Sequence, residues 1–309
     1  MAACRNPAKL IAQYKGEVRQ GDLRDADYLD RMLVGIDVVC HAAGWSSFEN
    51  SGDQCNQAYL EPTLDLINHA NEWRLSRFIN LSSIYVAPAS QRNNPAAKGK
   101  PQRNWPMINC HIAVEEYMRN MHQPRCQFVN LRLGLYSGKR LNMGLLSLLL
   151  SRNQQALLPY FNGSLGHLPL VDGRDIGQAF VRAALGPFEG HYSCLNIVGP
   201  ETASHAQVMA FIEEQLQVKP LLSYGLPAFV GSPALWLQGK IRRINGQPLL
   251  TSAMINMLKS PIIDNELAAQ QMGYDPEISW QASLLDTLEQ YRNQSLNNDI
   301  SQALRPLNV

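Results

Sequence analysis

Two adjacent serines follow the most strand-like segment of this chain. Residues 78–81 are mostly apolar and favour a buried β-strand within the segment 78–86, and Ser82 and Ser83 come directly after them. Open α/β sheets bind ligands at the carboxyl ends of their strands, so the two hydroxyls are candidate substrate or cofactor contacts. Serine also stabilises turns, so the same pair fits a strand that simply ends in a turn. The remainder of the chain must decide between these interpretations.

The composition narrows the class of protein. Of the 309 residues, 45% are hydrophobic and 17% are charged, which supports one large or two modest globular domains. The net charge is +1 without a basic run, so we expect no nucleic-acid partner. No apolar run is long enough to span a bilayer and no signal peptide is recognisable, so we expect a cytoplasmic protein without a membrane partner. The six cysteines include no CxxC pair, so we expect neither a metal site nor disulfides.

Strands and helices alternate along the first part of the chain. The expected strands are 2–4, 16–23, 36–44, 78–86 and 127–135. The expected helices are 26–33, 63–73 and 110–121. This order is typical of a parallel sheet covered by helices on both faces, so the predicted class is α/β.

The pattern changes after Tyr136. Ser204 and Gln207 have the spacing of a capping box, which predicts a helix that runs to Leu216. The other expected elements are a Leu-rich helix at 143–152, a strand at 168–172, a helix at 175–185, a strand at 195–198 and a final helix from Trp280 to Tyr291.

Seven short motifs, in the same order, resemble those of the extended short-chain dehydrogenase/reductase family, which includes nucleotide-sugar epimerases and dehydratases, dihydroflavonol reductases and 3β-hydroxysteroid dehydrogenases. The motifs are Arg5-Asn6-Pro7, Gly21–Asp25, Asp37–Gly44, Phe78–Val86, Leu131–Gly134, Leu170–Ala179 and Leu267–Pro276. The resemblance implies a Rossmann-type doubly wound sheet over residues 1–140 and 168–198 that binds NAD or NADP. It also implies a smaller, mostly helical substrate domain, interleaved with the first, over residues 141–309.

The resemblance also implies which residues hold the cofactor. Asp22 and Leu23 would flank the adenine. Arg5 follows the second strand of the family, where a cation suits a 2′-phosphate, so this residue favours NADP over NAD. The other implied contacts are residues near strand ends: Ala42, Ala43, Gly44, Ser82, Leu133 and Gly134.

Two parts of the family pattern are missing from this sequence. The family opens on a strand and a GxxGxxG turn that hold the pyrophosphate, and the sequence contains no such motif. We therefore expect this chain to be a fragment, with Met1 inside the second strand of the sheet. The family also uses Tyr-x-x-x-Lys on the helix after the serine strand. Here Met107 or Ile108 matches the Tyr, and His111 or Ile112 matches the Lys.

These departures leave two functions open. The resemblance implies an NAD(P)-dependent oxidoreductase or epimerase/dehydratase that acts on a small carbonyl or hydroxyl substrate. Ser83 and His111 would then be the candidate catalytic residues, because Ser83 keeps the family's Ser/Thr position and an imidazole can transfer protons near neutral pH. Alternatively, the chain is a non-catalytic dinucleotide-binding sensor or scaffold, or an inactive fragment. Family members dimerise through the helices expected here at 63–73 and 110–121, so we expect a homodimer.

Overall fold

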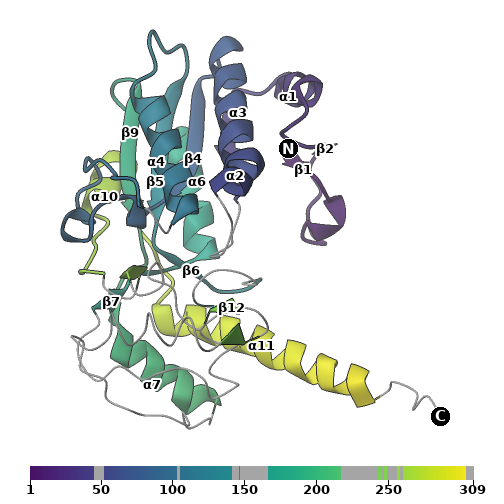
Figure 1. The fold of residues 1–309 in the computed structure, drawn as a ribbon, viewed down its shortest axis with the longest axis vertical. Helices are drawn as coiled ribbons and strands as arrows, with labels where there is room; N and C mark the ends of the chain where they lie inside the picture. Colours follow the sequence, from purple (N-terminus) through teal and green to yellow (C-terminus); the bar gives the residue numbers. More distant parts are fainter. Residues whose placement is uncertain are drawn as a thin grey trace.

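The centre of the protein is a sheet of four parallel strands in the order β3-β4-β5-β9 (Figure 1). The strands are β3 (Val38–His41), β4 (Arg77–Ser83), β5 (Gln127–Leu133) and β9 (Tyr192–Ile197). Ile79 of β4 lies between Cys40 of β3 and Val129 of β5 in the register, and both Ile79 and Val129 are fully buried. Such apolar strands belong in a parallel sheet that is covered on both faces.

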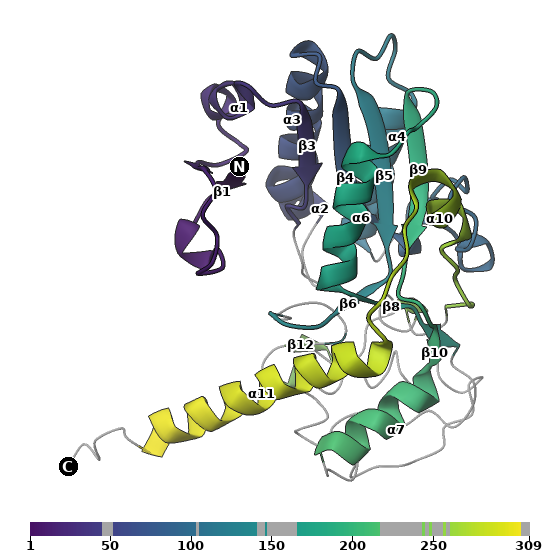
Figure 2. The ribbon, with the colours of Figure 1, turned by 180° about the vertical axis from the view of Figure 1, so that it is seen from behind.

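Helices cover both faces of this sheet (Figures 1 and 2). On one face lie α3 (Glu61–Glu72) and α4 (Pro106–Arg119), which bury residues such as Leu66 and Val114 in a shared hydrophobic cluster. On the other face, α6 (Gly173–Leu185) buries Ala179 and Ala183. The four strands therefore form the middle layer of a three-layer α/β structure.

A separate pair of parallel strands, β1 (Ala2–Cys4) and β2 (Val18–Gln20), lies beyond β3 (Figures 1 and 2). The helix α1 (Ala26–Leu33) follows β2 and packs against the same cluster as α3. Among the described strands, neither β1 nor β2 pairs with β3, so the sheet consists of two pieces. The described residues are 1–44, 52–102, 105–140, 146, 166–216, 243–244, 247–248, 256–257 and 260–303.

The remaining elements lie beyond the carboxyl ends of the four strands, except α10, which packs beside β9 (Figures 1 and 2). They include the long C-terminal helix α11 (Trp280–Ala303), which is tied to the sheet side of the molecule by a hydrogen bond of 2.7 Å from Ser283 Oγ to the Asp172 carboxylate. The others are β6 (Leu135–Ser137), β7 (His167–Leu168), β8 (Leu170–Asp172), β10 (Ala203–Ser204), α7 (His205–Leu216), β11 (Arg243–Ile244), β12 (Gln247–Pro248) and α10 (Glu266–Met272).

The predicted fold class is confirmed, and the boundaries differ in instructive ways. The strand at 78–86 ends at Ser83, because the Ser83 hydroxyl caps a short 3-10 turn at Ile84–Val86. The capping box is confirmed by reciprocal hydrogen bonds between Ser204 and Gln207. The helix expected at 63–73 is α3, and it is preceded by α2 (Gly52–Cys55) and a π-helical turn at Asn56–Leu60.

The helix expected at 110–121 begins earlier, at Pro106, because proline is favoured in the first turn of a helix. The helix expected at 143–152 lies outside the described residues, apart from Leu146. Within the described part of the chain, no helix is both long enough and apolar enough to cross a bilayer.

Candidate functional site

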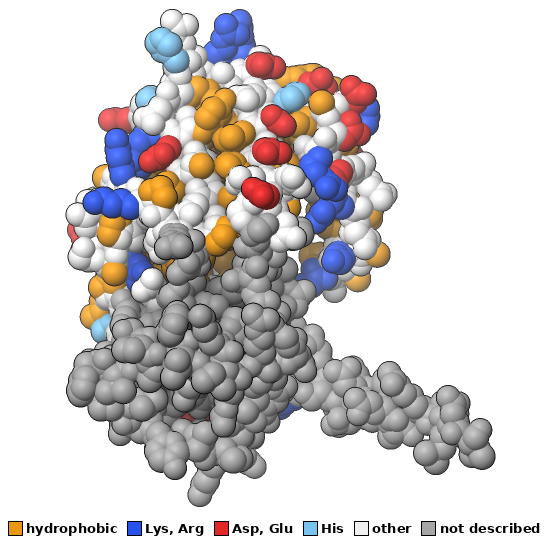
Figure 3. All heavy atoms as spheres, viewed as in Figure 1, with side chains coloured by type: hydrophobic (Ala, Val, Ile, Leu, Met, Phe, Trp, Pro, Cys, Tyr) orange, Lys and Arg blue, Asp and Glu red, His pale blue; other side chains and the backbone are white. Residues whose placement is uncertain are grey.

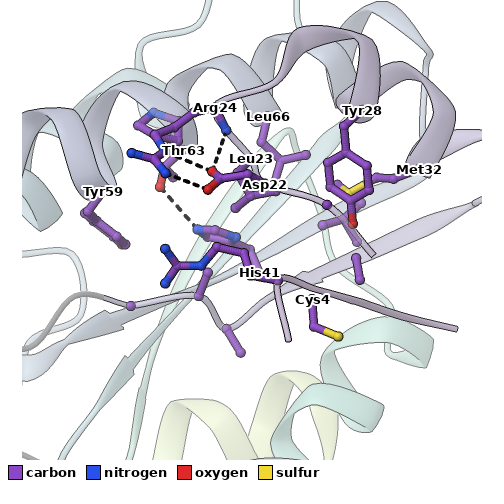
Figure 4. Close-up of a pocket in the computed structure, with 18 of the residues that line it drawn as sticks. Cys4, Asp22, Leu23, Arg24, Tyr28, Met32, His41, Tyr59, Thr63 and Leu66 are labelled. Atoms are coloured by element: carbon purple, nitrogen blue, oxygen red, sulfur yellow. Dashed lines mark hydrogen bonds and ion pairs between the residues drawn. The ribbon is translucent and has the colours of Figure 1, made fainter. Parts of the chain in front are cut away.

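A cavity of about 620 Å³ lies where the carboxyl ends of β1, β2 and β3 meet, beside α1 and α3 (Figure 4). This volume falls in the range of small-molecule sites in proteins, about 300–1,000 Å³. We call it the strand-end cavity. Its lining residues are Ala3, Cys4, Arg5, Gly21, Asp22, Leu23, Arg24, Tyr28, Met32, Val39, Cys40, His41, Ala42, Ala43, Gly44, Ala58, Tyr59, Pro62, Thr63 and Leu66.

Most of the cofactor residues implied by the family resemblance line this cavity together. They come from three separate segments: Arg5, then Asp22 with Leu23, then Ala42 to Gly44. Arg5 and residues 42–44 are exposed, so a ligand can reach them. Ser82, Leu133 and Gly134 are absent from the described lining of the cavity.

The anionic group in the cavity is Asp22, and Arg24 holds its orientation. The Asp22 carboxylate accepts hydrogen bonds from Arg24 Nε at 3.0 Å and Nη2 at 2.7 Å, and from the Arg24 backbone N–H at 3.0 Å (Figure 4). These bonds, the side-chain ones most of all, lower the pKa of Asp22 to about 2. Arg24 is thus a second cation at the cavity beside Arg5. Sequence analysis missed Arg24, although it is part of the quoted motif Gly21–Asp25.

Neutral polar groups form another part of the wall. His41 Nε2 lies 3.2 Å from Thr63 Oγ1, and the Tyr59 hydroxyl lies 3.0 Å from His111 Nδ1. Burial lowers the pKa of both imidazoles to about 4, so both are neutral at pH 7. A neutral His111 carries one ring hydrogen, so the Tyr59 hydroxyl donates to Nδ1 in one tautomer and accepts from the Nδ1–H in the other. Tyr59, which sequence analysis also missed, therefore connects the cavity to the helix that carries His111.

The two serines of β4 have local partners. Ser82 is buried and donates a hydrogen bond of 2.6 Å to Glu115 Oε1. Ser83 is half-buried, and its hydroxyl accepts a bond of 3.3 Å from the Tyr85 N–H. Among the described contacts, neither serine bonds to His111. The structure thus places Ser83 and His111 on neighbouring elements, β4 and α4, without bringing them into one hydrogen-bonded pair.

The helix positions that match the family's Tyr and Lys carry no equivalent chemistry. Met107, Ile108 and Ile112 are buried in the hydrophobic clusters. The remaining candidate, His111, is occupied at Nδ1 by Tyr59. No phenol or ammonium group therefore stands at these positions of α4.

The lining of the cavity suits one half of a dinucleotide. Two arginines, the apolar Leu23 and the small residues 42–44 suit an adenosine group with or without a 2′-phosphate. A diphosphate usually needs free N–H groups at a helix N-terminus. The helix that starts beside the cavity, α1, is capped by the Asp25 carboxylate, which would repel a phosphate. Within the described residues, the lining therefore suits the adenosine half, and the helix start beside it carries a carboxylate.

Metal chemistry has no visible basis in the described residues. No group of three or more His, Cys, Asp or Glu side chains there has the arrangement of a metal site.

A parallel sheet with helices on both faces, and a cavity at its strand ends, define a Rossmann-type nucleotide-binding fold. The model of the NAD dependent epimerase/dehydratase family matches residues 2–199, and the chain belongs to this family. No curated protein matches the chain.

Solved structures support the fold. The chain is similar to the Bordetella bronchiseptica enzyme WbmG in complex with NAD and UDP, with a TM-score of 0.66, 14% identity, and coverage of 94% of this chain and 86% of that one. It is also similar to the UDP-glucose 4-epimerase of Thermotoga maritima with UDP-glucose, with a TM-score of 0.67, 14% identity, and coverage of 95% and 90%. A Bacillus cereus UDP-glucuronic acid 4-epimerase mutant gives a TM-score of 0.63 at 20% identity, with coverage of 90% and 82%.

Proposed function

We propose that this chain binds a nicotinamide dinucleotide by its adenosine half and has lost the Tyr-dependent catalysis of its family. The observation that carries the proposal is the convergence of Arg5, Asp22, Leu23 and residues 42–44 on one cavity. The bound dinucleotide would supply hydride chemistry in the family, but no step through it follows from the residues present. The function is that of a dinucleotide-binding sensor or scaffold.

The cofactor is NADP rather than NAD on this proposal. Arg5 and Arg24 both line the cavity, and the Asp22 carboxylate is already engaged by Arg24. Arg5 remains available for the additional negative charge of a 2′-phosphate. An adenosine with a free 2′-hydroxyl would gain nothing from this cation.

Binding of nucleotide halves tests the proposal by calorimetry. We expect 2′,5′-ADP to bind about as tightly as NADP, because both carry the part that fits, and 5′-AMP to bind at least tenfold more weakly. Arg5→Ala should remove this preference, whereas Lys9→Ala, outside the cavity, should keep it. Absence of binding by both nucleotides, or an unchanged preference in Arg5→Ala, would contradict the proposal.

One contact favours an enzyme as the second candidate function. The Tyr59–His111 hydrogen bond links a phenol at the cavity to an imidazole, which is an acid/base pair of altered composition. Such an enzyme would oxidise or epimerise a hydroxyl of a small substrate, and sugar nucleotides are the first class to test because several similar structures hold them.

The enzyme candidate is tested by nicotinamide absorbance with UDP-sugars, with Tyr59→Phe, His111→Ala and Ser83→Ala as variants. Turnover that disappears in Tyr59→Phe and His111→Ala would establish it. Background rates, together with saturable binding of 2′,5′-ADP, would leave the sensor or scaffold as the function.

We also propose a homodimer through α3 and α4. The outer face of these helices carries hydrophobic side chains between acidic ones (Figure 3), and it includes a shallow groove lined by Leu64, Asn68, Tyr117 and Met121. Tyr117 is 37% exposed in the single chain. Tyrosines that become buried when two chains associate are frequent anchors of protein interfaces. Light scattering should give a dimer that Tyr117→Asp converts to a monomer; a monomeric wild type would refute this arrangement.

A further inference from the structure

A row of polar side chains crosses the buried face of the sheet under α4. Ser82 of β4, Arg132 of β5 and Asn196 of β9 are partners in the register, so their side chains lie side by side. The bond from Ser82 to Glu115 of α4 places the row on the face that this helix covers. All members of the row are buried. Such faces of parallel sheets are normally apolar, so each donor and acceptor of the row needs a partner.

Arg132 uses only part of its hydrogen-bonding capacity. A guanidinium group has five N–H donors, one on Nε and two on each Nη. Nε donates to Glu115 Oε1 at 3.0 Å, and Nη2 donates to Glu115 Oε2 at 2.6 Å and to Ala97 O at 2.8 Å. Nη1 is buried and has no hydrogen-bond partner among the described residues. Two N–H donors of one buried cation are therefore unsatisfied.

Asn196 leaves a matching acceptor unsatisfied on the next strand. Its amide nitrogen donates to Arg92 O at 2.9 Å, which fixes the orientation of the amide group. Its Oδ1 therefore points away from that carbonyl, and in the described part of the chain this buried oxygen accepts no hydrogen bond. A donor on Arg132 and an acceptor on its register partner thus lack partners together.

Arg132 and Asn196 fasten the same segment of the chain. Asn196 bonds the carbonyl of Arg92, and Arg132 bonds the carbonyl of Ala97. We call residues 92–99 the covering segment. Its backbone is therefore held to the sheet by two neighbouring side chains, one from β5 and one from β9.

The covering segment packs closely on α4. A Cβ atom added to Gly99 would lie 2.4 Å from the Ile112 side chain and 2.9 Å from Val86 O, an approach that glycine permits because it has no Cβ. Ile112, one of the positions that can match the family's Lys, is buried. The fastening of the covering segment therefore helps to keep this part of α4 away from solvent.

We propose that Arg132 Nη1 and Asn196 Oδ1 hold one buried water molecule, which bridges them and completes the fastening of the covering segment. The water accepts a hydrogen bond from Nη1 and donates one to Oδ1, as the polarity of the two groups requires. The inference goes beyond dinucleotide binding, because this site lies among β5, β9 and α4 and shares no residue with the lining of the strand-end cavity.

The charge of the site selects water over an ion. Glu115 already neutralises Arg132 through a salt bridge of 2.6 Å, and both side chains are buried. An anion would be repelled by this carboxylate and a cation by the guanidinium, in a region where water screens charges weakly. A water molecule is neutral and offers both donors and an acceptor. Its immobilisation costs less than two buried groups without partners.

A crystal structure of the full chain at atomic resolution tests the proposal. We expect an ordered water about 2.7–3.2 Å from both Arg132 Nη1 and Asn196 Oδ1. Crystals grown in bromide identify the ligand, because an anomalous bromide peak at this position would show an anion and overturn the proposal. A direct hydrogen bond between the two side chains, or no density between them, would also overturn it.

Hydrogen exchange measures the fastening in solution. Asn196→Leu removes the acceptor for the water and the donor to Arg92 O, whereas Asn196→Asp removes only the donor. We expect Asn196→Leu to speed exchange of the Ala97 amide about tenfold, and Asn196→Asp to speed it clearly less. Ser193→Ala, on the opposite face of β9, should leave the exchange unchanged.

Equal acceleration in Asn196→Leu and Asn196→Asp would contradict a role of the water in the fastening. The crystal structure uses the wild-type chain, so that test stands even if Asn196→Leu does not fold.

Discussion

The two pieces of the sheet use similar ion pairs in opposite environments. In the four-strand piece, Arg132 and Glu115 form a bidentate pair with 0% and 2% of their side chains exposed. In the two-strand piece, Arg19 pairs with Glu17 at 2.6 Å, with 23% and 59% exposed. Burial makes the first pair expensive to break, while water screens the second. Removal of one partner therefore costs more stability at the buried pair than at the exposed one.

The contrast extends to the groups around each pair. Glu115 also accepts hydrogen bonds from Ser82 and Asn130, which connects β4, β5 and α4 in one buried network. The exposed strand β1 and the segment that follows β2 instead contribute residues that line the strand-end cavity, among them Cys4 and Asp22. Regions of low local stability are where binding sites that must open or accept a partner are usually found.

The largest expected effect comes from Glu115→Gln. The substitution keeps the shape of the side chain but leaves the Arg132 cation buried without a counter-charge, so we expect a loss of about 3–5 kcal/mol in the free energy of unfolding. Urea denaturation measures it. The matched change in the exposed piece, Glu17→Gln, should barely move the midpoint. Equal losses in the free energy of unfolding for Glu115→Gln and Glu17→Gln would contradict the contrast between the buried and the exposed ion pair.

The second effect is a loss of stability in acid that depends on His41. Burial, with a smaller contribution from His111, lowers the pKa of His41 from 6.5 to about 4 in the folded chain. Because the unfolded chain takes up the proton first, stability is complete above pH 6.5 and falls as the pH drops towards 4, by about 2–3 kcal/mol for this group. His41→Asn should reduce the fall over this window, which His111 and His205 share because burial lowers the pKa of each to about 4, and His122→Asn, on the surface, should leave it unchanged.

The smallest expected effects come from the N-cap aspartates of two helices, one in each piece of the sheet. Asp25 caps α1 through the Tyr28 N–H, and Asp172 caps α6 through the Arg174 N–H. Asp25→Ala should cost about 1 kcal/mol, the usual value for a cap. Asp172→Ala should cost roughly 2 kcal/mol or more, because its buried carboxylate also accepts from Ser283. Thermal unfolding of both variants measures the difference, and a larger cost for Asp25 would contradict it.

Local patterns made much of the fold predictable from sequence. The helix at 26–33 has its expected bounds, and the strands around Ile79 and Val129 lie where apolar, β-branched residues are concentrated. These features depend on neighbours in the sequence. The separation of β1 and β2 from β3 depends on pairing between distant segments. The periodicity of the local sequence carries no information about such pairing.

The site was predictable only in part, for the same reason. The residues near the first three strand ends converge as the resemblance implied, because parallel strands bring their carboxyl ends to one edge. The partner of Ser82, Glu115, is 33 positions away, and nothing in the local sequence indicates that contact. Tyr59, which contacts His111, lies in a π-helical turn, and the sequence showed no sign of that turn.

That turn, Asn56–Leu60, changes the angular order of the helical side chains around it. A π-helical turn holds one residue more than an α-helical turn, and each residue of an α-helix accounts for about 100° of rotation. A π-helical turn absorbs this additional residue within a single turn, so α2 and α3 keep nearly the same phase on either side of it. Deletion of a single residue within 56–60 should therefore restore the ordinary pitch without rotating α2 away from the face that it shares with α3. The wider turn also places Tyr59, which contacts His111, within it.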